Sequence, residues 1–152
     1  MHTRIYRFTS CFFQTIALLC VFSFSSCTTY YIPVDSFKKQ FAFAGSLQPR
    51  EVTTRGPGGD KVTYKTYQID SIACVDKKGN PAMLKNSPSI EIRFTDSSNR
   101  KTIFYFDLLH VTDSTIRGGQ SRFIPSVHKT IRISTVKLIE VQDGKKDFHY
   151  VP

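Results

Sequence analysis

The chain has 152 residues, a length that suits one small domain and leaves little room for two. It carries 21 Lys and Arg against 12 Asp and Glu, a formal net charge of +9, and these charges are scattered rather than gathered into a basic helix or an arginine-rich arm. This pattern argues against nucleic acid as a partner and favours contacts with a membrane or a glycan.

The first segment is typical of a secretory signal. Arg4 and Arg7 precede an almost uncharged run, residues 8–24, that is rich in Phe, Leu, Ile, Val and Cys. A spanning helix needs about 20 strongly apolar residues, and this run is shorter and diluted by Ser, Thr and Gln. The sequence therefore predicts a signal peptide over residues 1–26 that is cleaved rather than kept as a transmembrane helix.

Small residues and a cysteine end this signal. Phe24-Ser25-Ser26-Cys27 resembles the lipobox of bacterial lipoproteins, which ends in small residues followed by cysteine, although Phe24 stands where the family usually has Leu. The resemblance implies that the Cys27 thiol receives diacylglycerol, that the bond before it is cut, and that the new amino group can be acylated, for example by palmitate. Such acyl chains form a lasting membrane anchor. The alternative is an ordinary secretory signal that contains a cysteine.

The residue after Cys27 bears on location. Thr28 is not the Asp that the family associates with inner-membrane retention, so the resemblance implies an outer-membrane protein of the cell envelope. No acidic cluster follows Cys27, which favours the periplasmic side over the cell surface. After removal of the signal, 19 basic residues remain against 12 acidic ones, because Arg4 and Arg7 leave with it.

Cysteine usage predicts a domain without disulfides. Cys11 and Cys20 belong to the signal and Cys27 takes the lipid, so Cys74 stands alone. Apolar neighbours in "SIACV" indicate a buried small hydrophobe rather than a nucleophile.

Residues 27–40 are predicted to form a lipidated tether, and residues 41–152 one β-rich domain. Asp35 or Ser36 can cap a short helical turn that ends near Gln40. Phe41 and Phe43 then alternate like one side of a strand.

Period-two patterns predict strands from residue 50 onward. Residues 61–66 and 90–95 alternate apolar and polar side chains, as half-buried strands do. Residues 101–111, "KTIFYFDLLHV", are apolar on both faces and predict a central strand. Residues 136–151 predict a hairpin, because Asp143-Gly144 tolerates the positive φ of a two-residue turn.

Short turns join these strands. Residues 75–81 and 96–101 are rich in Asp, Asn, Gly and Ser, and short connections favour antiparallel pairing. The predicted fold is therefore mainly β: a small antiparallel meander that forms either a barrel or a sandwich.

Local motifs for chemistry are weak. "RGPGGDK" at residues 55–61 lacks the phosphate-loop spacing and is predicted to be a hairpin loop. His110, His128 and His149 do not share the spacing of a metal site, so no metal, cofactor or catalytic residue is assigned. A site assembled from distant positions stays possible at this point.

One loop stands out as a candidate binding surface. "IRGGQSRF" combines paired glycines with polar side chains, and the candidate residues are Gly118, Gly119, Gln120, Ser121 and Arg122. A plain bend between strands is the simpler interpretation.

The leading hypothesis is a membrane-anchored, non-enzymatic lipoprotein whose β domain binds an envelope protein or an anionic lipid or glycan. A lipid-anchored hydrolase or sugar-processing enzyme with a site built from separate loops is the alternative. A structural envelope spacer is the third. The sequence does not indicate an oligomeric state.

Overall fold

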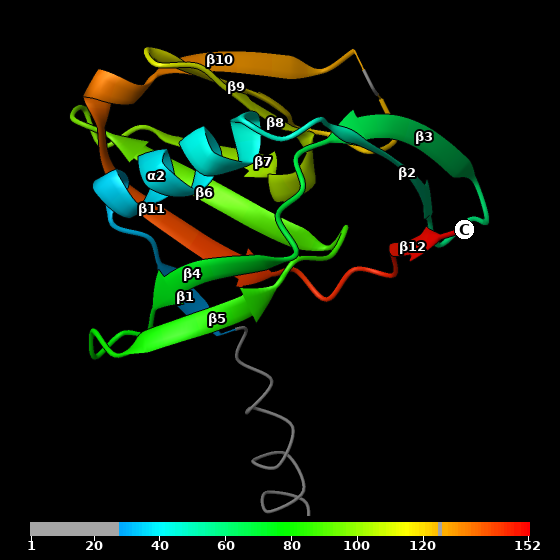
Figure 1. Ribbon diagram of the computed structural model, residues 1–152, viewed down its shortest axis with the longest axis horizontal. Coiled ribbons are helices and arrows are strands. Elements are labelled where there is room, and N and C mark those ends of the chain that lie inside the picture. Colours follow the sequence, from blue (N-terminus) through cyan, green and yellow to red (C-terminus); the bar gives the residue numbers. More distant parts are fainter. Residues whose placement is uncertain (1–27, 125) are drawn as a thin grey trace, which may run out of the picture.

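A computed structural model of the chain describes residues 28–124 and 126–152 (Figure 1). The predicted signal and Cys27 lie outside the described residues. The elements are, in chain order, β1 (Thr29–Tyr31), α2 (Val34–Gly45), β2 (Arg50–Arg55), β3 (Lys61–Thr66), β4 (Ser71–Val75), β5 (Pro81–Lys85), β6 (Ile90–Asp96), β7 (Lys101–Tyr105), the 3₁₀ turn η2 (Phe106–Leu108), β8 (Leu109–Val111), β9 (Thr115–Gly119), β10 (His128–Arg132), the 3₁₀ turn η3 (Ile133–Thr135), β11 (Val136–Asp143) and β12 (His149–Val151).

The strands form three antiparallel sheets. A six-stranded sheet has the order β5-β4-β1-β11-β6-β7, and two three-stranded sheets have the orders β10-β9-β8 and β12-β2-β3. The mainly β, antiparallel prediction is confirmed. Within the described ranges no sheet closes into a barrel, which is consistent with a sandwich.

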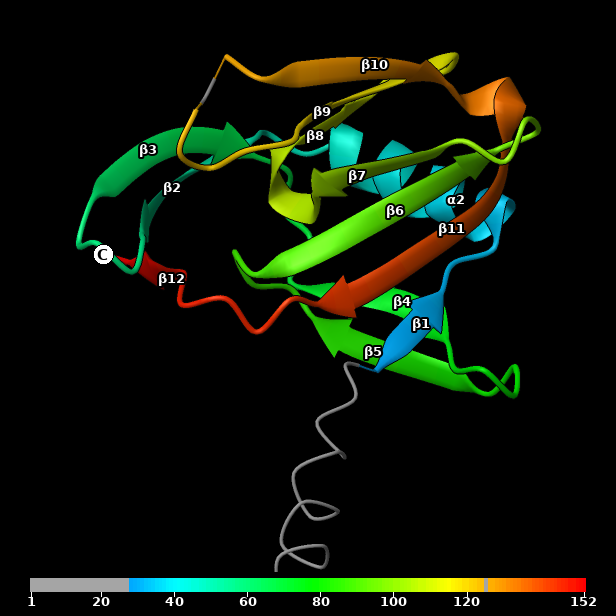
Figure 2. The ribbon, with the colours of Figure 1, turned by 180° about the vertical axis from the view of Figure 1, so that it is seen from behind.

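Helix α2 covers one face of the six-stranded sheet (Figures 1 and 2). Its buried residues Phe37, Phe41 and Ala44 follow the i, i+4, i+7 spacing of an amphipathic helix. Phe37 packs edge-on against Phe94 of β6, with ring centroids 5.5 Å apart. The strand predicted at Phe41 and Phe43 is therefore wrong: both lie in α2, and Phe43 points outward with 72% of its surface exposed.

The folded domain begins earlier than residue 41. Strand β1 pairs with β11, with Tyr30 opposite Val141, and Tyr31 also pairs with Val75 of β4. Residues 29–40, expected to form a tether, thus belong to the fold, because β1 fills the gap between two strands of the six-stranded sheet.

The predicted central strand over residues 101–111 is broken in two. Strand β7 is an edge strand of the six-stranded sheet, and the chain leaves it through η2 to enter the other sheet as β8. The run is apolar on both faces because Phe104, Phe106 and Leu109 are all buried where the sheets meet. Buried Asp107 sits at the break.

The predicted hairpin over residues 136–151 is also wrong. Strand β11 pairs with β6 and β1, whereas β12 pairs with β2. Asp143 accepts hydrogen bonds from Ser89 Oγ (2.5 Å) and the Lys145 amide (2.9 Å), and the Gly144 amide donates to the Ser89 carbonyl (3.0 Å). These bonds lead the chain away from β11 instead of folding it back.

The short turns are confirmed. At the β4–β5 turn, Asp76 Oδ1 accepts the amides of Lys78 (2.7 Å) and Asn80 (2.9 Å). Asp96 does the same at the β6–β7 turn, and hydrogen bonds from Asn80 lower the pKa of Asp76. Residues 55–61 form the predicted β2–β3 hairpin loop, in which Gly59 has a φ of +86°.

Candidate binding surface

The β10–β9–β8 sheet carries a group of basic side chains on its outer face. The register places His110 opposite Arg117, and Arg117 opposite Thr130. His128 and Arg132 lie two residues either side of Thr130, hence on the same face. All four basic residues are exposed. They are called the basic face below, and Arg117 is its centre, because diagonal neighbours on a sheet lie about 7–8 Å apart.

The basic face has no acidic partner among the residues that the structure describes. Strands β8, β9 and β10 contain no Asp or Glu, and Asp113 lies exposed in the β8–β9 turn. In the part of the chain that the structure describes, none of the four side chains of the basic face forms an ion pair. The basic face is thus a positive surface open to a negatively charged ligand.

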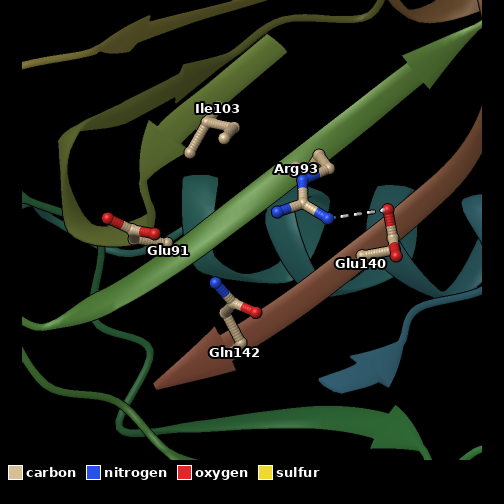
Figure 3. A pocket seen from close by; sticks show the side chains of 5 residues that line it. All are labelled: Glu91, Arg93, Ile103, Glu140 and Gln142. Atoms are coloured by element: carbon tan, nitrogen blue, oxygen red, sulfur yellow. Dashed lines mark ion pairs between the residues drawn. The ribbon is translucent and has the colours of Figure 1, made fainter. Parts of the chain in front are cut away.

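The outer face of the six-stranded sheet is different. Arg93 Nη1 lies 3.6 Å from Glu140 Oε2 across β6 and β11 (Figure 3). Glu91, on the same face, pairs with Lys146. The charges within each of these two pairs neutralise each other.

A buried polar cluster anchors one end of the β10–β9–β8 sheet. Arg122 Nη2 lies 2.5 Å from Asp107 Oδ1, and the two side chains are 4% and 0% exposed. Asp107 Oδ2 accepts hydrogen bonds from the hydroxyls of Tyr64 and Tyr150, the latter at 3.1 Å. Thr66 Oγ1 donates to the Asp107 carbonyl at 2.8 Å. Tyr64, Asp107, Arg122 and Tyr150, called the Asp107 cluster, thereby tie β3, η2, the β9–β10 connection and β12 together.

Burial and charge set the protonation of this cluster. Burial raises the pKa of Tyr64 and Tyr150 well above the usual range, and the nearby Asp107 carboxylate raises them further. Burial alone lowers the pKa of Arg122, but Asp107 more than offsets this and the net direction is upward. The phenols therefore stay protonated as donors, and Arg122 stays charged.

The candidate loop predicted from the sequence is divided by the structure. Gly118 and Gly119 lie in β9, not in a loop, and are buried. A Cβ at Gly118 would lie 2.5 Å from Phe104 Cγ, and one at Gly119 would lie 2.8 Å from Leu108 Cδ1. The glycines thus allow β9 to pack closely over these side chains rather than shape a polar surface.

The other three candidate residues have separate roles. Gln120 is exposed, and its Nε2 donates to the Ile103 carbonyl at 3.5 Å. Ser121 Oγ accepts the amides of Phe123 (3.2 Å) and Ile124 (3.1 Å). Arg122 turns inward to Asp107, and its guanidinium carbon lies 4.3 Å from the centre of the Tyr105 ring. Arg122 is therefore not available to a ligand on the surface.

Two grooves border the basic face. One, of about 380 Å³, runs beside β10, between residues Lys129–Arg132 and the adjoining ends of β6 and β7. The other, of about 590 Å³, is lined by His110 and His128 together with Tyr64 and Tyr67. Both volumes fall within or near the usual range for ligand sites.

The structure keeps the histidines and Cys74 on separate elements. His110, His128 and His149 are exposed on three different strands, and the described residues hold no group of three or more His, Cys, Asp or Glu suited to a metal ion. Cys74 is buried as predicted, its Sγ lies 3.4 Å from the Ala82 carbonyl, and burial raises the pKa of its thiol.

Two features escaped the sequence analysis. Asp107 was a signal in itself, as the one charged residue inside the aromatic run "IFYFDLL". In the sequence, the basic face is visible only as "HKTIR", a segment without acidic residues. Which residues of β8 and β9 lie beside this segment depends on the strand register, which the sequence does not reveal.

Comparison with known proteins gives no relative: no family model, no curated protein and no solved structure matches the chain. Among the described residues, no helix is long and apolar enough to cross a membrane.

Proposed function

We propose that this protein is a lipid-anchored envelope lipoprotein whose β domain binds an anionic partner through the basic face. The observation that carries the proposal is the unpaired charge of Arg117 and Arg132, which the strand register groups on one sheet face with the imidazoles of His110 and His128. Surface charges that are not used for pairing within the molecule are free to attract a ligand of opposite sign.

The position of the basic face supports a partner other than the anchoring membrane. Strand β1 begins at Thr29, two residues after Cys27, so its end of the domain stays close to a lipid on Cys27. The β10–β9–β8 sheet lies at the opposite end of the molecule from β1 (Figures 1 and 2). The basic face is then directed away from that bilayer, towards an envelope protein or glycan.

The Asp107 cluster supports binding rather than catalysis. Both carboxylate oxygens of Asp107 already accept hydrogen bonds, and the side chain is inaccessible to solvent. A general base needs a free oxygen within reach of its substrate, and this carboxylate offers none. The cluster is suited to hold strands in place.

The test uses the full chain, purified in detergent and incorporated into neutral phosphatidylcholine vesicles. Sulfated dextran and polyglutamate should bind at low ionic strength. They should dissociate at high salt, because the electrostatic screening length falls below about 10 Å. Arg117→Gln with Arg132→Gln should weaken this binding by roughly tenfold or more. The matched control, Lys145→Gln with Lys146→Gln, removes the same charge elsewhere and should have little effect.

Equal losses from the two pairs would mean diffuse attraction without a site, and binding that ignores salt would indicate an apolar interface instead. The anchor is tested separately by detergent-phase partitioning. Cys27→Ala should move to the aqueous phase, and unchanged partitioning would reject the lipid anchor.

A further inference from the structure

Strand β10 has a free edge. It pairs with β9 and is the outermost strand of its sheet. The Ile133 amide donates to the Ser114 carbonyl (2.9 Å), and the Val127 carbonyl accepts from the Gln120 amide (3.0 Å), both towards the β9 side. Because antiparallel bonding alternates every second residue, Lys129 and Ile131 also direct their backbone groups towards β9. The backbone groups of His128, Thr130 and Arg132 consequently point outward, where a further strand would pair.

The groove of about 380 Å³ lies along this edge. Four consecutive residues of β10, Lys129–Arg132, form one wall, and Phe94, Thr102 and Val136 lie among the residues opposite. An added strand would send every second side chain towards this groove and the others towards solvent. This is the arrangement in which a sheet edge supplies affinity through the backbone and a groove supplies selectivity through side chains.

The charge of the edge selects the occupant. Lys129 and Arg132 lie in β10, and Lys129 Nζ donates to Thr102 Oγ1, another residue that lines the groove, at 3.0 Å. Arg100 and Asp96, which also line the groove, pair with each other at 2.9 Å, so the net charge of the lining comes from Lys129 and Arg132. A second copy pairing through β10 would set like charges against each other, the device by which proteins prevent edge-to-edge association. The same charges favour an acidic strand.

We propose that an extended, acidic segment of a partner protein docks along β10 as a fourth strand of the β10–β9–β8 sheet. This proposal rests on the proposed function, since it names the anionic partner of the basic face as a polypeptide. Acidic side chains on the outer side of the added strand lie next to Arg132 and near Arg117, and its backbone pairs with Thr130 and its two flanking outward residues.

The test again uses the full chain in neutral vesicles or detergent. The probe is a fluorescent eight-residue peptide in which Glu alternates with Thr and Val, and its Lys-substituted counterpart is the charge control. The Glu peptide should bind and the Lys peptide should not. Thr130→Pro removes an outward amide at a position where an edge strand tolerates proline, and it should weaken peptide binding by about tenfold or more. Thr130→Val keeps that amide and should stay within about twofold of the wild type.

Hydrogen exchange provides a readout that does not depend on any variant. In the free protein the amides of His128, Thr130 and Arg132 should exchange fast, while those of Lys129 and Ile131 are protected by β9. Added Glu peptide should slow exchange at the first three. Unchanged exchange in the presence of bound peptide would overturn strand addition.

The outcomes separate the two proposals. If Thr130→Pro binds the peptide like the wild type while Arg117→Gln with Arg132→Gln loses it, the side chains alone bind, so the proposed function stands and strand addition is wrong. If sulfated dextran binds and the Glu peptide does not, the proposed function also stands and strand addition is also wrong, and the partner is a glycan. If neither anionic probe binds, both proposals fail.

Discussion

The outer faces of two sheets use charge in opposite ways. On the six-stranded sheet, Arg93 pairs with Glu140 (Figure 3) and Glu91 pairs with Lys146, so acidic and basic side chains are interspersed there. On the β10–β9–β8 sheet, the basic face places the positive charges of Arg117 and Arg132 on neighbouring strands with no acidic side chain on those strands. Like charges on neighbouring strands destabilise a sheet. This unfavourable arrangement on the β10–β9–β8 sheet fits the proposal that the basic face binds an anionic ligand.

The largest difference in stability should appear when the buried Asp107–Arg122 pair and the partly exposed Arg93–Glu140 pair are each broken. Asp107→Ala leaves the Arg122 charge buried without its carboxylate and removes the acceptor of Tyr64 and Tyr150. The free energy of unfolding should fall by about 3–5 kcal/mol, measured by urea denaturation. Glu140→Gln breaks the partly exposed Arg93 pair and should cost no more than about 1 kcal/mol.

A double variant identifies the cause of the loss. Asp107→Leu with Arg122→Met removes both charges and should recover part of the stability lost in Asp107→Ala, because no charge is left buried alone. A double variant less stable than Asp107→Ala would assign the loss to packing and would weaken the comparison between the two faces.

The next largest effect is a fall in the free energy of unfolding at alkaline pH. Burial and Asp107 raise the pKa of Tyr64 and Tyr150 in the folded protein, whereas in the unfolded chain tyrosine ionises near pH 10. The unfolded state therefore loses protons that the folded state keeps. The contribution of these two tyrosines to stability should be fully present below about pH 10 and should be lost as the pH rises above it.

Urea midpoints between pH 8 and 11 measure this dependence. Tyr64→Phe with Tyr150→Phe should flatten the decline. Lys146, on the other face, also has a raised pKa: burial lowers it, but Glu91 and Tyr105 more than offset that. Lys146→Gln should flatten the decline less, because its side chain is 43% exposed. A decline that is steeper without the tyrosines would contradict the assignment.

Local patterns were sufficient where the partners are local. Strand β6 could be predicted because Ile90, Ile92 and Phe94 alternate with polar residues, and the turns at Asp76 and Asp96 could be predicted because each carboxylate bonds amides two and four residues ahead.

The predictions that failed depend on distant partners. Phe41 and Phe43 alternate like a strand, and only the sheet beneath α2 distinguishes the helix. The run over residues 101–111 is apolar on both faces because two sheets share it. In the candidate site, Arg122 is buried because Asp107 lies 2.5 Å away, and no local pattern reveals that pair. Arg117, exposed in β9, was the residue of that segment suited to a ligand.

The smallest effect is the change in the free energy of unfolding when one arginine is removed from each face. It tests the difference between the two faces most directly, because the expected change has opposite signs on them. Arg117→Gln removes one of two neighbouring positive charges and should raise the free energy of unfolding by up to about 0.5 kcal/mol. Arg93→Gln removes the partner of Glu140 and should lower it by about 0.2–1 kcal/mol. Both changes should shrink in about 1 M salt, where the screening length is near 3 Å. Urea denaturation of the two variants at low and high salt gives all four values. If Arg117→Gln were destabilising at low salt, Arg117 would be stabilising the fold after all, and the basic face would lose its distinction from the paired face of the six-stranded sheet.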